Sequence, residues 1–114
     1  MLPAVHRLRS SSDFTEVTRH GRKATVGPVV AYVLFSDTPG AARLGLTVGR
    51  QVGGSVMRHR VSRVLRAGMA AQIAGLPSGT RVVLRALPGS GEDDDLAGHA
   101  QQALSAAMAK AGRS

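Results

Sequence analysis

The sequence predicts a single α+β domain, built as a two-layer α-β sandwich. Helical and strand-like segments alternate along the chain, its 114 residues suit one modest core, and 43% of them are hydrophobic. We predict the order α-β-β-β-α-β-α, and the residue patterns locate two of the first three strands. The domain spans 1–114, with a basic N-terminal segment at 1–10 and a tail at 112–114.

The first half of the chain predicts a helix followed by two strands. The helix is expected over 11–20, where serines offer N-caps and two acids suit the first turn, and Gly21 ends it. A β-branched run at 26–35 and an alternating segment at 43–50 predict strands. Because a turn signal at 37–40 lies between them, we expect these strands to pair as an antiparallel hairpin.

A helix with two different faces is predicted over 55–74. At 100° per residue, the arc expected to face the core holds Met57, Val61, Val64, Leu65 and Gly68. The opposite arc is basic or polar and holds Arg58, His59, Ser62, Arg63 and Arg66, with Arg60 at the boundary.

The last third predicts a strand and a helix. The strand at 80–87 carries Arg81 and Arg85 on one side, and the helix at 94–111 follows an acidic cluster at 92–95. The residues that this helix is expected to bury are Leu96, Ala100, Ala103, Leu104, Ala107 and Met108. The strand at 43–50, the helix at 55–74 and this strand form a split β-α-β unit.

Charge is the strongest functional signal. The formal net charge is +8, six arginines fall within 43–66, and no acid lies between Asp37 and Glu92. An uncompensated positive face points to a polyanion, and nucleic acid is the leading class. The alternative is a basic surface that is merely solvated. The helix at 55–74 has no acid for i,i+4 pairs, and Gly53-Gly54 lets backbone amides approach a phosphate, which favours an RNA or DNA backbone.

Two aromatic residues are candidates for contact with unpaired bases. Phe14 and Tyr32 either belong to the core or form a stacking platform near one groove, whereas Phe35 is expected in the core. Catalysis is poorly supported, because the histidines lack metal-ligand spacing and the carboxylates are scattered. No catalytic residue or metal ligand is assigned. Without cysteines, a signal peptide or a membrane-length apolar run, we expect a cytoplasmic protein with no membrane partner.

The segments at 43–48 and 52–63, with Arg66, resemble the signature of the bacterial ribonuclease P protein component family. The spacing of arginines after the glycine pair is the most specific part, and the resemblance covers about residues 4–110. Other matching positions are His6-Arg7-Leu8, Asp13-Phe14, Val17, His20-Gly21, Tyr32 and 82–87.

The resemblance implies the small protein subunit of a ribonucleoprotein that removes the 5′ leader from precursor tRNA. In such an endoribonuclease the RNA subunit is the catalyst and holds the magnesium ions, with none assigned to the protein. The partners are then the catalytic RNA and precursor tRNA, not DNA. The implied fold has a left-handed β-α-β crossover and is similar to the second domain of ribosomal protein S5.

Roles follow from the resemblance position by position. Contacts to the catalytic RNA are implied for Arg50, Gly53, Arg58, His59, Arg60, Arg63 and Arg66. A cleft for the leader is implied at Phe14, Tyr32, Arg7 and Arg9. The chain departs from the family pattern at several positions, among them Gly54, His59, Ser62 and Thr18, the last standing where a second cleft aromatic is expected.

Three other classes compete with this interpretation. A structural RNA-binding protein of ribosomal type would bind RNA without stimulating cleavage of precursor tRNA. A helix-turn-helix DNA binder fits poorly, because strand-like segments flank the basic helix and its paired helix is missing. A stand-alone nuclease is the weakest candidate, given the scattered carboxylates.

Overall fold

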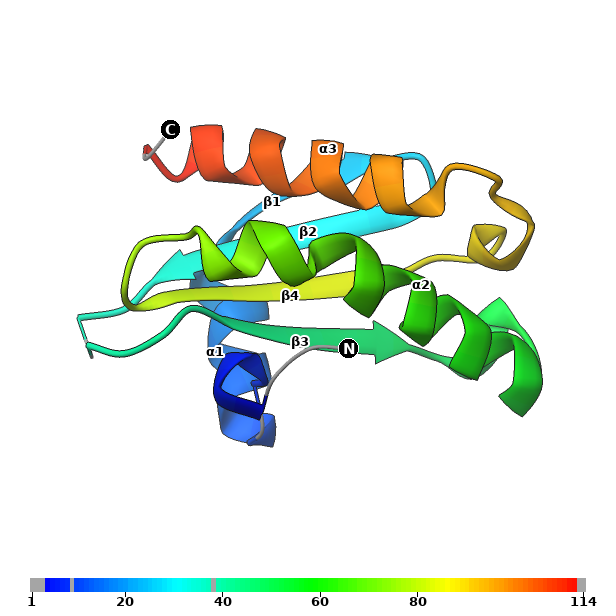
Figure 1. Cartoon of the computed structure of the whole chain (residues 1–114), viewed down its shortest axis with the longest axis horizontal. Helices are drawn as coiled ribbons and strands as arrows, with labels where there is room; N and C mark the ends of the chain where they lie inside the picture. The colour runs from blue at the N-terminus through cyan, green and yellow to red at the C-terminus, as the bar shows by residue number, and fades with distance from the viewer. Residues whose placement is uncertain (1–3, 9, 38, 113–114) are drawn as a thin grey trace.

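The structure, a computed structural model, describes residues 4–8, 10–37 and 39–112, and it confirms the α+β class and the element order (Figure 1). The main elements are α1 (Ser11–His20), β1 (Arg22–Val26), β2 (Val29–Phe35), β3 (Arg43–Val48), α2 (Ser55–Ala74), β4 (Thr80–Ala86) and α3 (Leu96–Lys110). Single 3-10 turns lie at η1 (Ala4–His6), η2 (Arg50–Val52) and η3 (Ser90–Glu92).

The strands form one sheet in the order β1-β2-β4-β3. The expected hairpin between 26–35 and 43–50 is wrong, because β4 lies between β2 and β3. The run at 26–35 instead contains the end of β1, a tight turn and all of β2. Gly27 adopts a φ of 54° in that turn, so the chain reverses there and β2 pairs antiparallel with β1. The other edge of β2 pairs with β4.

The predicted β-α-β unit is present as β3, α2 and β4. Its two strands are parallel direct neighbours, so no strand lies between them and the unit is not split. The left-handed crossover stays a prediction. After Val48 the chain leaves the sheet through η2 rather than continuing as strand to residue 50.

The two faces of the sheet are covered unequally. Helices α2 and α3 pack on one face over the main core, and α1 alone lies against the other (Figure 1). Leu8, Val17 and Val83 form a second, smaller core under α1. Since side chains alternate along β4, Val82 and Leu84 join the main core while Arg81, Val83 and Arg85 face the side of α1.

The buried stripe of α2 contains Val61 and Leu65 of the predicted arc but not Val64. It consists of Val61, Leu65, Met69 and Ile73, all at most 1% exposed. This i,i+4 row continues down the whole helix and sets its rotation, so Val64 remains 36% exposed and Arg58 becomes half-buried. The helix predicted at 94–111 matches α3, with Met108 only partly buried against the core.

Candidate nucleic-acid interface

The first candidate surface lies where α2 passes the end of β3. Val48, Arg58, His59, Ser62 and Arg66 line a groove of about 310 Å³, here called the arginine groove. His59 and Arg66 are exposed, Ser62 is half-buried, and α2 contains no acid that could pair with either arginine. The groove therefore presents uncompensated positive charge beside a polar hydroxyl.

Arg58 is half-buried in the arginine groove, whereas Arg66 is exposed. The Nε atom of Arg58 is buried and has no hydrogen-bond partner among the described residues. An unpaired buried donor costs about 1–3 kcal/mol, and more when the group is charged. A phosphate oxygen is a strong acceptor for a guanidinium, so a shift of the Arg58 side chain toward an anion in the groove would remove this cost.

The other residues predicted to contact the catalytic RNA lie around the arginine groove rather than in it. Arg50 is exposed in η2, and Arg63 is exposed on the outer side of α2. Gly53 joins these elements with a φ of 153°, and a Cβ there would approach Cγ of Met57 to 2.9 Å. Arg60 lies on the opposite side of α2, in a hollow shared with the acidic segment 92–95.

The second candidate surface is a cleft of about 300 Å³ between α1 and the sheet. Its lining, here called the aromatic cleft, consists of Phe14, Thr15, Thr18, Tyr32, Thr47, Val83 and Arg85. These side chains come from α1, β2, β3 and β4. The arrangement places two aromatic rings, the hydroxyls of three threonines and one guanidinium around a space open to solvent.

Gly45 determines how close Phe14 comes to the sheet. A Cβ on Gly45 would lie 2.5 Å from Cε2 of the Phe14 ring and still closer to Cζ. The ring therefore rests on the backbone of β3, where only glycine leaves room for it. Phe14 and Tyr32 also pack against the small core of Val17 and Val83, so both rings contribute to the core and line the cleft. Their stacking on bases stays a prediction.

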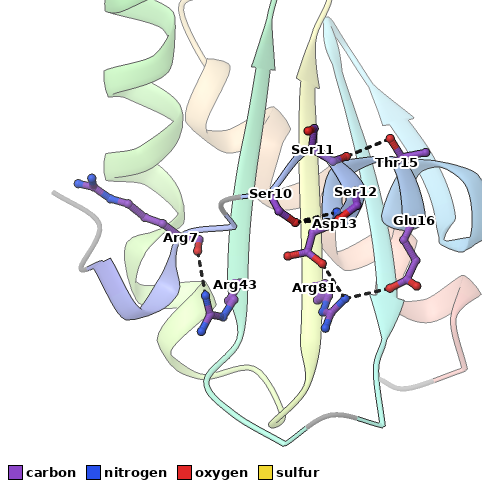
Figure 2. A network of polar contacts seen from close by, with 9 residues as sticks. All are labelled: Arg7, Ser10, Ser11, Ser12, Asp13, Thr15, Glu16, Arg43 and Arg81. Atoms are coloured by element: carbon purple, nitrogen blue, oxygen red, sulfur yellow. Dashed lines mark hydrogen bonds and ion pairs between the residues drawn. The ribbon is translucent and has the colours of Figure 1, made fainter.

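Ion pairs hold α1 against β4. The Nη1 atom of Arg81 lies 2.9 Å from Glu16 Oε1 and 3.4 Å from Asp13 Oδ1 (Figure 2). The Ser10 hydroxyl caps α1 by accepting from the N–H of Asp13. The charge of Arg81 is thus compensated. Arg85, which follows Arg81 on the same side of β4, is exposed and has no ion pair within the described part of the chain.

The N-terminal residues predicted for the leader cleft are placed differently. Arg7 bridges to Leu44 beside β3, its carbonyl accepts from Arg43, and its side chain extends away from α1 (Figure 2). It does not line the aromatic cleft, so its contact with a leader stays a prediction. Arg9 lies outside the described residues.

Arg85 lines the aromatic cleft but was not among the cleft residues predicted from the sequence. Its shared side with Arg81 followed from strand alternation, but nothing local showed that α1 would supply acids to one arginine only. Thr18 was expected at a cleft position, whereas Thr15 and Thr47 gave no sequence signal. Their positions depend on the docking of α1.

A histidine-carboxylate pair lies near the start of α3. Nδ1 of His99 is 2.5 Å from Oδ2 of Asp93, and the backbone N–H of Asp95 donates to Oδ1 of Asp93. These hydrogen bonds, that of His99 above all, hold the pKa of Asp93 below its usual value. Across 4–8, 10–37 and 39–112, no three ligating side chains gather where they could hold a metal ion, and no helix is suited to cross a membrane.

Comparison with known proteins identifies the family. The model of the ribonuclease P family matches residues 2–112, which is nearly the whole chain. The chain belongs to the ribonuclease P protein family. A ribonuclease P protein is the protein component of a ribonucleoprotein, so the family implies an RNA partner.

Curated relatives agree with the family assignment. The ribonuclease P protein component of Acidothermus cellulolyticus is 49% identical over 90 residues, which cover 77% of this chain and 74% of that protein. That of Streptomyces avermitilis is 42% identical over 118 residues, covering 95% and 93%. The chain thus spans most of the length of these ribonuclease P proteins.

Solved structures show the same fold at low identity. The Staphylococcus aureus RNase P protein superposes with a TM-score of 0.73 at 18% identity, covering 93% of this chain and 94% of that one. The Thermotoga maritima RNase P protein gives a TM-score of 0.70 at 21% identity, covering 89% and 94%. The fold is thus that of ribonuclease P proteins from distant bacteria.

Proposed function

We propose that this chain binds the catalytic RNA of ribonuclease P and the single-stranded 5′ leader of precursor tRNA, and so assists removal of the leader. The RNA subunit performs the endonucleolytic cleavage, and the protein supplies affinity and position. Magnesium is held mainly by the RNA. The described side chains offer no cluster of three ligands, so no step is assigned to a metal on the protein.

One observation carries the proposal beyond general RNA binding. The aromatic cleft unites Phe14, Tyr32 and Arg85 on the face of the sheet that α1 leaves partly open. Such a combination suits an unpaired strand, because bases stack on rings while a guanidinium contacts the backbone. A purely structural RNA-binding protein has no need of this cleft.

The arginine groove supplies the second contact. Each arginine that neutralises a phosphate releases counterions and stabilises the complex with folded RNA. With the groove on the catalytic RNA and the cleft on the leader, the protein holds the leader in a fixed position relative to the catalytic RNA. Holding the scissile bond near the RNA-bound metal lowers the entropic part of the barrier.

The test is cleavage of a precursor tRNA by the cognate catalytic RNA at low magnesium, with and without the protein. We expect strong stimulation by the protein and no cleavage by the protein alone. Tight RNA binding without stimulation would support the alternative, a structural RNA-binding protein. In that case the departures at Gly54, His59 and Ser62 are the first positions to restore to the family residues.

A further inference from the structure

The two sides of α2 differ in charge along its first three turns. One side faces β3 and carries the arginine groove. The other faces the connection from β4 to α3, which lies beside the N-terminal half of α2 (Figure 1). There the four acids of 92–95 share a hollow of about 480 Å³ with Arg60, Val61 and Val64.

The carboxylates of 92–95 are held as a negative group. Asp93 is fixed by His99 and has a lowered pKa, so it stays ionised at neutral pH. Glu92 and Asp94 are exposed. Within the described ranges Arg60 makes no ion pair within 4.0 Å. The carboxylates of 92–95 are therefore not paired directly with the Arg60 guanidinium.

The arginine groove has the opposite character. No acid lines it, and the buried Nε of Arg58 lacks an acceptor among the described residues. Charges interact over about 8 Å at physiological ionic strength. A phosphate that approaches Arg60 from the α3 side enters the field of several carboxylates, whereas one that enters the groove meets no carboxylate in its lining.

We propose that bound RNA lies on the β3 side of α2, and that the 92–95 carboxylates exclude it from the α3 side. Arg60 then contributes less to RNA binding than Arg66, although both are exposed arginines of one helix. The acids are specificity-determining residues, because repulsion that penalises wrong orientations weakens non-cognate RNA more than cognate RNA. This inference rests on the proposed RNA-binding function.

The first test compares Asp94→Asn with Asp37→Asn in the full chain. Both changes remove one exposed carboxylate, but Asp37 follows β2 at the opposite end of the sheet from the start of α2. Affinities are measured for the catalytic RNA and for an unrelated RNA of equal length. We expect Asp94→Asn to tighten binding of the unrelated RNA about twofold at low salt, and so to reduce the ratio of the affinity for the catalytic RNA to that for the unrelated RNA. Adding Glu92→Gln should increase the gain. Effects no larger than those of Asp37→Asn would overturn the inference.

The second test ranks the arginines. Arg66→Ala should weaken binding of the catalytic RNA several-fold more than Arg60→Ala, and Arg60→Ala should cost more once Glu92 and Asp94 are neutral. Equal losses for the two single variants would overturn the inference while leaving the proposed function intact. No loss for either variant would overturn both.

Discussion

The arginine groove and the aromatic cleft differ in how they are built and in what they can recognise. The groove consists of four residues within three turns of α2 and Val48 beside them, and its chemistry is positive charge. The cleft gathers residues from four elements, and only Arg85 among them is charged. Charge acts at a distance and weakens with salt, whereas stacking requires contact and is little affected by salt. The same small domain can therefore hold a folded RNA and a flexible strand by separable means.

The largest expected effect is loss of the groove. Arg58→Ala or Arg66→Ala should weaken binding of the catalytic RNA about 10- to 100-fold, the range for hydrogen bonds to charged groups. Each should also reduce the slope of log affinity against log salt by about one. Filter binding over a salt series measures both quantities.

The matched control for the groove is Arg22→Ala. Arg22 is exposed on β1 and lines neither the groove nor the cleft, yet its loss changes the net charge equally. If Arg22→Ala reduced affinity as much as Arg66→Ala, net charge rather than the groove would account for binding. Thermal melts of all three variants separate misfolding from lost contacts.

The second prediction concerns the cleft. Phe14→Ala should weaken binding of leader-bearing precursor tRNA about 5- to 100-fold, given about 1–3 kcal/mol for a stacked base, and should leave mature tRNA nearly unchanged. The salt slope should not change. Phe35→Ala is the control, because that ring packs against the main core on the other face of the sheet. An equal loss of leader preference in Phe14→Ala and Phe35→Ala would mean that Phe14 has a purely structural role.

The groove was largely predictable from the sequence and the cleft was only partly so. Arginine spacing on one helix is a local property, so the charged surface followed from helical periodicity. Periodicity also separates Arg60 from Arg58, but which of the two would lie on the β3 side did not follow from it. That choice depends on the rotation that Val61, Leu65 and the rest of the buried row impose. The cleft depends on strand order, and the hairpin prediction failed because pairing of β2 with β4 is a long-range choice. Arg85 and Thr47 are neighbours only in that sheet.

The third prediction tests whether the depth of the cleft matters. Gly45→Ala forces the Phe14 ring off β3, since a Cβ would overlap it. We expect the preference for leader-bearing tRNA to fall about 3- to 10-fold, with affinity for the catalytic RNA unchanged, and stability to fall by about 1–3 kcal/mol from overpacking. A double-mutant cycle isolates the cause. Adding Gly45→Ala to Phe14→Ala should cost little further leader preference, and additive losses would contradict action through Phe14.

The smallest expected effect is a gain of affinity for leader-bearing precursor tRNA. Thr18 lines the aromatic cleft one turn after Phe14. Among the described residues its hydroxyl donates to backbone carbonyls of α1, so Thr18→Phe removes no hydrogen bond between elements there. A second ring beside Phe14 should tighten binding of leader-bearing precursor about two- to fivefold, less than the loss from Phe14→Ala because the new ring starts exposed and pays rotamer entropy on ordering. Equilibrium titration with and without the leader measures the change. Thr25→Phe is the matched control, because Thr25 is exposed on β1 and does not line the aromatic cleft. An equal gain of affinity for mature tRNA would mean that the new ring acts as a general apolar contact. That result would contradict the assignment of the cleft to the leader.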